Sequence, residues 1–278
     1  MTAILALASA FIIGTSDFLL GLGSRGAQPQ RVPISSNVMS AVTLLVLAPF
    51  LTATESTIGG YAFGALVGVS GTAGFTLYLI ALRDGKMSIV APTTAIISAL
   101  ALVAIGIIGG ERLSFVASIG VGLAILAAFL ISRSDDPADN EGFGLRSFYL
   151  AIAAGVVFAL FFWSLGQIPE GAGVWPLLVA RGVSLPLQTA IAIAFTGGWR
   201  VPRNTLRVTL PAGAFEAIAI VLAAEALRRG PLAIAGVLTG LYPVSTVLLA
   251  WVVLHERLGR VQWVAVALAF IAAPLTTL

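Results

Sequence analysis

The sequence predicts an all-α polytopic membrane protein: ten transmembrane helices in two inverted five-helix repeats around a central cavity. Three observations support this prediction. Hydrophobic residues make up 59% of the chain and charged residues only 10%, which is far from the composition of a soluble domain. Apolar runs recur between short turns, and most are long enough to cross a hydrocarbon core of about 30 Å. Finally, the second half of the chain repeats the first.

The internal repeat has a constant offset of 145 residues. Residues 81–130 and 226–275 are identical at sixteen of fifty positions without a gap. Chance matching of Ala and Leu does not explain this similarity, because the polar turns match as well. The matched turn residues are Arg83 with Arg228, Gly85 with Gly230, and Glu111-Arg112-Leu113 with Glu256-Arg257-Leu258.

The predicted spans follow the apolar runs, which Gly/Pro/Arg turns separate. The first repeat, residues 1–132, contains the spans 3–22, 32–52, 60–82, 88–109 and 114–132. The second repeat, residues 146–278, contains the spans 146–166, 173–195, 206–227, 231–254 and 260–277. Between them, residues 133–145 form the one long polar stretch, which indicates a solvated linker.

An odd number of spans in each half has a geometric consequence. The second half must enter the membrane from the opposite side, so the two halves form an inverted repeat. Such repeats place the substrate site near the midplane where the halves meet, and rocking of one half against the other gives alternating access. Rows of small residues favour close helix packing. One span contains Gly60, Gly64 and Gly68, and another contains Gly120, Ala124 and Ala128.

The distribution of positive charge predicts an orientation. Eleven of the fifteen basic residues lie in the loops that share a side with the linker. The positive-inside rule therefore places the linker in the cytoplasm and both termini outside.

Composition also excludes several classes of function. The chain has no Cys and one His, so disulfides, thiol catalysis and the usual metal spacings are absent. No basic cluster alternates with aromatic residues, which argues against nucleic-acid binding. The first apolar run lacks a basic leader and contains Asp17, which argues against a cleaved signal peptide. We expect no cofactor, and the expected partners are a small-molecule substrate and the lipid bilayer, with no requirement for an oligomer.

The repeated Ala-Leu-Arg-x-Gly turn, the following apolar helix and the Gly/His-Glu-Arg-Leu stop resemble the drug/metabolite transporter superfamily, most closely its EamA-type exporters. The resemblance implies export of small metabolites, often amino acids, across the inner (plasma) membrane through a central cavity. It also implies cytoplasmic termini, opposite to the charge distribution. The chain departs from the family pattern at three positions: Ser98 where a proline is common, Ser36 where an arginine is common, and Asp17 where an amide is usual.

Charged residues within predicted spans are costly and are candidates for function. Arg181 and Glu216 lie near the middle of neighbouring spans, offset in depth by about 4.5 Å. One interpretation is a buried ion pair that fixes the two helices. The other is a site for the carboxylate and ammonium groups of a zwitterion, or a proton site at Glu216.

Asp17 has no cation one helical turn away, since its neighbours there are Ile13, Gly14, Leu20 and Gly21. Burial without a cation favours the neutral acid, which suits proton coupling or contact with a cation. The alternative is a carboxylate that reaches a wet vestibule.

Further polar and aromatic residues predict a mainly apolar cavity with a few orienting hydrogen bonds. Thr239 and Tyr242 form a stripe on the ninth span, and Thr94 and Ser98 match it on the fourth. Tyr78, Trp163 and Asn37 complete the set. For the aromatic residues the alternative is packing against lipid or helices, and for Asn37 it is a bridge between helices.

The predicted function is therefore a secondary transporter. The alternatives are a facilitative channel or uniporter for small amphipathic solutes, and an intramembrane enzyme. An enzyme is disfavoured because paired catalytic acids, a His cluster and a nucleophile turn are missing from the sequence.

Overall fold

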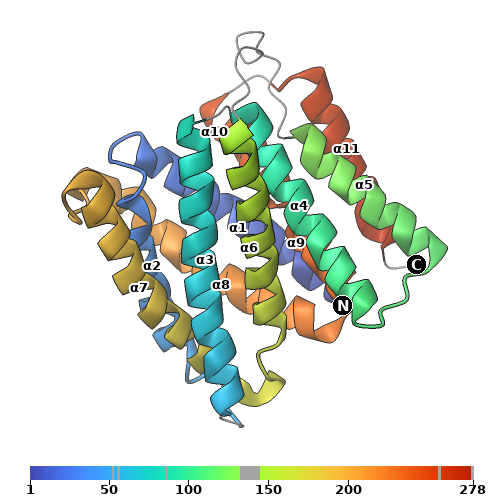
Figure 1. Cartoon of the computed structure of the whole chain (residues 1–278), viewed down its shortest axis with the longest axis horizontal. Coiled ribbons are helices and arrows are strands. Elements are labelled where there is room, and N and C mark those ends of the chain that lie inside the picture. The colour runs from blue at the N-terminus through green and yellow to red at the C-terminus, as the bar shows by residue number, and fades with distance from the viewer. Residues whose placement is uncertain (52, 55–56, 85–86, 132–144, 256–257, 277–278) are drawn as a thin grey trace.

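The structure is a computed structural model that describes residues 1–51, 53–54, 57–84, 87–131, 145–255 and 258–276. The secondary structure of these residues is helical, without strands (Figure 1). The first half contains α1 (Thr2–Ser24), α2 (Val32–Leu47), α3 (Ile58–Asp84), α4 (Met87–Ile108) and α5 (Phe115–Ile131). The second half contains α6 (Leu145–Gly166), the 3-10 turn η2 (Glu170–Ala172), α7 (Trp175–Thr196), α8 (Arg203–Arg229), α9 (Leu232–Thr239), α10 (Tyr242–Leu254) and α11 (Arg260–Leu275).

Six helical segments of the described chain are long and apolar enough to cross a membrane: 2–24, 58–83, 145–166, 175–196, 203–229 and 232–254. Four shorter apolar helices accompany them, at 32–47, 93–108, 115–131 and 260–275. The protein is a multi-pass membrane protein.

Two helix boundaries differ from the sequence prediction. The span expected at 32–52 ends as a helix at Leu47, because Pro49 has no N–H to donate to the Leu45 carbonyl. The span expected at 231–254 is broken between α9 and α10 at Gly240 and Leu241. Pro243 has no N–H to donate to the Thr239 carbonyl, so the α9 helix cannot continue through this point.

Helices pack across the two halves in a reciprocal pattern. Helix α1 packs on α8 as α6 packs on α3, and α2 packs on α8 as α7 packs on α3. Helices α5 and α11 pack on each other. Equivalent helices of the two halves therefore pack on equivalent helices of the opposite half.

Glycines allow the closest of these crossings, as the rows of small residues predicted. A Cβ on Gly213 of α8 would lie 2.1 Å from the Ser36 carbonyl oxygen of α2. A Cβ on Gly68 of α3, the repeat equivalent of Gly213, would lie 2.5 Å from the Ala180 carbonyl oxygen of α7. Any side chain at these positions would force the helices apart.

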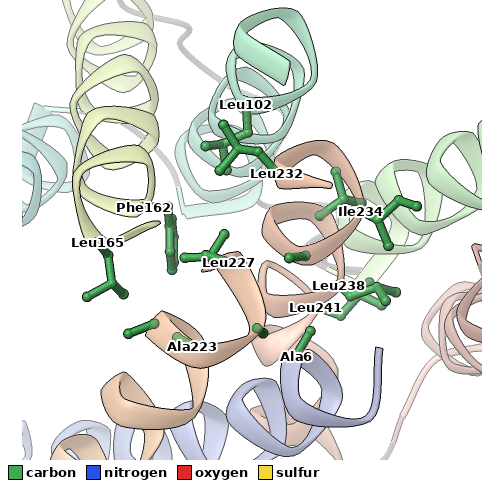
Figure 2. Packing of buried hydrophobic residues seen from close by; sticks show 14 of the residues in the cluster. Ala6, Leu102, Phe162, Leu165, Ala223, Leu227, Leu232, Ile234, Leu238 and Leu241 are labelled. Atoms are coloured by element: carbon green, nitrogen blue, oxygen red, sulfur yellow. The ribbon is translucent and has the colours of Figure 1, made fainter. Parts of the chain in front are cut away.

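The bundle has two ends, the terminal end and the opposite end. The terminal end is where α1 begins and α8 and α11 end, near the N and C labels in Figure 1. The opposite end is where α1 and α3 end and α6 begins; there Ser147 of α6 donates to the Ala81 carbonyl of α3 at 2.7 Å. The main hydrophobic cluster extends to the terminal end, where side chains of α1, α4, α6, α8 and α9 meet (Figure 2).

Candidate functional site

A buried ion pair joins α7 and α8. Arg181 is 9% exposed, and its Nη1 lies 2.8 Å from Oε1 of Glu216. The second carboxylate oxygen, Oε2, accepts a hydrogen bond of 2.8 Å from the Ser36 hydroxyl of α2. The α2–α8 crossing at Gly213 brings Ser36 close enough for this contact. The structure thus joins the two residues that the sequence placed at similar depth.

Asn37 bridges α2 and α7 beside this pair. Its Nδ2 donates to the Ser184 hydroxyl and to Oε1 of Gln188, both at 2.8 Å. Its Oδ1 accepts from Nη1 of Arg181 at 3.3 Å. Asn37 therefore makes the helix bridge that the sequence left as an alternative, and it also contacts the ion pair.

The Arg181 guanidinium retains hydrogen-bonding capacity. Its Nε and Nη2 are buried and have no hydrogen-bond partner among the described residues. Buried donors are normally satisfied by protein or by ordered water. Because a guanidinium matches a carboxylate in shape and charge, these nitrogens suit a carboxylate or water molecules.

Asp17 of α1 belongs to the same polar region. It is half-buried, interacts electrostatically with Glu216, and makes no hydrogen bond or ion pair with any described residue. Helices α1 and α8 are antiparallel, since Ser9 donates to the Ala219 carbonyl and Ser16 to the Ala212 carbonyl. This register separates Asp17 from Glu216 by roughly 7 Å along the bundle. The region thus holds two carboxylates and one guanidinium.

Tyr78 of α3 and Tyr242 of α10 lie near Asp17. Both are half-buried, and both lie close enough to Asp17 for its charge to act on their hydroxyl groups. A close approach of α1 to α10 positions Tyr242: a Cβ on Gly14, one turn before Asp17, would lie 2.5 Å from the Tyr242 carbonyl oxygen. Three helices therefore contribute an acid and two phenols to one place.

The break between α9 and α10 lies at this region. Thr239 ends α9 and Tyr242 begins α10, so the predicted polar stripe flanks the break. The Thr239 hydroxyl is buried and has no hydrogen-bond partner among the described residues. Broken helices at membrane depth are tolerated where they are buried in protein or line a cavity, and they commonly form transporter sites.

Thr94, Ser98 and Trp163 lie outside the contacts described above. The Thr94 hydroxyl donates to the Ala151 carbonyl of α6 at 3.2 Å, and Ser98 is buried on α4. Trp163 makes an edge-to-face contact with Phe63, with ring centroids 5.8 Å apart. The Trp163 contact agrees with the alternative of aromatic packing, and no described contact joins Thr94, Ser98 or Trp163 to Arg181 or Asp17.

Sequence reasoning missed Ser36, Ser184 and Gln188 as members of the polar network. Ser184 and Gln188 follow Arg181 at three and seven residues on α7, a spacing that puts them on one helical face. Ser36 occupies the repeat position of Arg181. Both signals were present in the sequence.

Glu111 links the two halves of the chain. Its carboxylate accepts the backbone N–H groups of Leu232 and Ala233, the latter at 3.1 Å, and so caps α9 of the other half. Glu225 pairs with Arg228 and Arg229, which follow it on α8 at three and four residues. Glu256, the repeat equivalent of Glu111, lies outside the described residues.

A shallow groove lies between α3 and α7 near the opposite end, lined by Gln30, Thr76, Leu79, Ile80, Arg83, Ile191 and Phe195. None of the candidate residues lines it.

Comparisons with known proteins address the family and the fold. The model of the EamA-like transporter family matches residues 1–133 and again residues 146–278. No curated protein sequence matches. One similar solved structure, titled "Crystal structure of protein", has a TM-score of 0.78 at 16% identity. The alignment covers 99% of this chain and 95% of that one, so the two share a fold.

Proposed function

Since the chain belongs to the EamA-like transporter family, we propose that it is a secondary transporter that exports small metabolites, such as amino acids, by alternating access. Its repeats, residues 1–132 and 146–278, would be inverted around a central cavity in the inner (plasma) membrane. The reciprocal packing of α1 on α8 and α6 on α3 supports a two-fold relation between the halves. Such a relation lets one half rock against the other.

The observation that carries this proposal is the charge arrangement at Arg181, Glu216 and Asp17. A zwitterionic amino acid presents a carboxylate and an ammonium group close together. The carboxylate would bind the Arg181 nitrogens that lack a partner among the described residues, and the ammonium would face Asp17 and Glu216. Tyr78, Tyr242 and Thr239 would supply the apolar wall and hydrogen bonds.

Asp17 and Glu216 also suit proton coupling. The Glu216 carboxylate accepts hydrogen bonds from Arg181 and Ser36. Asp17 has no such partner among the described residues and interacts with the negative charge of Glu216. Two nearby carboxylates favour binding of a proton at one of them, and Asp17, which no described side chain holds, would be the one that carries it. Substrate ammonium and a proton would then compete for Asp17, which couples their movements.

Flux in reconstituted vesicles tests this proposal. The purified protein is placed in vesicles, and accumulation of radiolabelled amino acids is measured with and without an imposed pH gradient. We expect uphill accumulation that the gradient drives and that Arg181→Gln abolishes. Downhill flux alone would indicate a uniporter or channel, and absence of flux for amino acids, organic amines and organic acids would contradict transport of this class.

A further inference from the structure

Repeat-equivalent residues lie in unlike environments at the two ends of the bundle. Figure 2 shows Phe162 and Leu165 of α6 packed with Ala223 and Leu227 of α8. These four side chains are 8%, 0%, 1% and 5% exposed. Subtracting the 145-residue offset gives Asp17, Leu20, Tyr78 and Leu82 on α1 and α3, all of which are half-buried.

The backbone shows the same difference. A Cβ on Gly166, at the end of α6, would lie 3.3 Å from the Leu227 Cβ of α8. The equivalent pair on α1 and α3 is Gly21 and Leu82. A Cβ on Gly21 would meet no described atom within 4 Å. The ends of α6 and α8 are therefore in contact, whereas the end of α1 lacks the corresponding neighbour.

The paired arginines differ in the same direction. Arg228 is half-buried, pairs with Glu225, and its Nη1 lies 3.5 Å from the carbonyl oxygens of both Ile168 and Pro169. Arg83, its repeat equivalent, is exposed and makes no hydrogen bond or ion pair with a described residue. Ile80 stands at the position equivalent to Glu225, so α3 offers Arg83 no acid three residues earlier.

We infer that the α6–α8 contact is a closed gate at the terminal end and that the ends of α1 and α3 are its open counterpart. This inference rests on the proposed alternating access. In the other state the two ends exchange roles: Arg228 leaves the α6 end, and Arg83 reaches the carbonyl oxygens of Gly23 and Ser24, which are equivalent to Ile168 and Pro169. In the transport cycle Arg83 and Arg228 thus act by holding helix ends together and not by contact with the substrate.

Residues at the open end share helix faces with residues of the charged site. Gly21 is one helical turn beyond Asp17, and Leu82 is one turn beyond Tyr78, so each pair shares a helix face. At the closed end the equivalent positions hold Phe162 and Ala223, which are apolar and buried. Asp17 therefore exchanges protons and substrate with the opposite end in this state. The Glu225–Arg228 pair, which α3 lacks, biases the protein toward this state.

The absence of cysteine from the sequence permits a direct test by cross-linking. A disulfide needs Cβ atoms about 3.5–4.5 Å apart, close to the separation at Gly166 and Leu227. The double variant Gly166→Cys/Leu227→Cys should cross-link readily on oxidation. The matched double variant Gly21→Cys/Leu82→Cys should cross-link slowly at rest and faster during substrate exchange. Either cross-link should abolish transport, and a reductant should restore it.

The single cysteine variants serve as controls that keep their transport under oxidant. Substrate-independent cross-linking of Gly21→Cys/Leu82→Cys, or persistent transport with either pair cross-linked, would contradict the gate while leaving transport itself established. Absence of transport in the parent would instead contradict the proposed function.

Neutralising the arginines gives a second readout that a purely structural role does not produce. Arg228→Gln should increase the cross-linking rate of the Gly21→Cys/Leu82→Cys pair, because the terminal end opens more often. Arg83→Gln should decrease that rate. Equal changes in the same direction, or no change, would rule out opposed gate roles for the two arginines.

Discussion

Ser36 and Arg181 occupy equivalent positions in the two repeats, and both donate a hydrogen bond to the carboxylate of Glu216. The carboxylate therefore lies between repeat-related positions, close to where a two-fold axis would pass. Only one half carries the arginine and the glutamate, since Gly71 stands at the position equivalent to Glu216. The Arg181–Glu216 pair is therefore not repeated in the first half, although the helices of the two halves pack in a reciprocal pattern.

The first prediction concerns the Arg181–Glu216 pair. Glu216→Gln leaves the buried guanidinium unpaired and should cost about 3–5 kcal/mol of stability. Arg181→Gln should cost less, roughly 2–3 kcal/mol, because the Glu216 side chain is 34% exposed and water screens its charge. Unfolding of the purified variants in detergent, followed with denaturant, measures both values.

The double variant Arg181→Gln/Glu216→Gln is the control for this prediction. It removes both charges, so its cost should be smaller than the sum of the single costs by at least about 1 kcal/mol. Strict additivity would show that the two side chains do not form a pair in the folded protein.

A second prediction follows from the α2–α8 crossing. The Cβ of Gly213→Ala would overlap the Ser36 carbonyl oxygen at 2.1 Å, so the helices must separate. We expect a loss of about 1–3 kcal/mol together with reduced transport, because Ser36 moves away from Glu216. Gly122→Ala is the matched control: a Cβ there meets no described atom within 4 Å, and its stability should equal or exceed that of the parent. Tolerance of Gly213→Ala would show that the crossing is looser than described.

The third prediction concerns the cap on α9. Glu111→Ala removes the acceptor for the buried N–H groups of Leu232 and Ala233. Leaving such groups unsatisfied should cost about 1–3 kcal/mol. Arg112→Ala changes the exposed neighbouring side chain and should change stability by less than about 0.5 kcal/mol. If both variants unfold at the same denaturant concentration, Glu111 does not cap the helix.

Much of this arrangement could be predicted from the sequence, because it depends on spacing within single helices or on the repeat. The depth of Arg181 and Glu216 followed from their places in two antiparallel apolar runs. Close packing at Gly64 and Gly68 followed from four-residue spacing, and the structure shows both glycines against α7. The 145-residue offset also identified the residues that distinguish the two ends of the bundle.

Other features depend on contacts between distant parts of the chain. The Glu111 carboxylate accepts hydrogen bonds from the start of α9, which lies about 120 residues later in the chain. The break at Gly240 and Leu241 lies within an apolar run whose hydropathy gives no sign of it. Trp163 was a candidate for the cavity, and only the fold shows that its ring packs on Phe63.

The fourth prediction concerns orientation. Charge distribution favours a cytoplasmic position for the opposite end, although the linker residues 133–144 lie outside the described residues. Arg200 and Glu170 are both exposed, near opposite ends of α7. In intact cells, Glu170→Cys should react with a membrane-impermeant thiol reagent, and Arg200→Cys should react only after permeabilisation. The reverse pattern would place both termini in the cytoplasm.

The central claim is that a carboxylate of the charged centre couples transport to protons, and Asp17→Asn tests it most directly. The amide keeps the size of the side chain but cannot exchange a proton. In reconstituted vesicles the parent should accumulate amino acid against its gradient when a pH gradient is imposed. Asp17→Asn should retain exchange of labelled for unlabelled substrate and lose the accumulation driven by pH. Equal accumulation by Asp17→Asn and the parent would contradict the account.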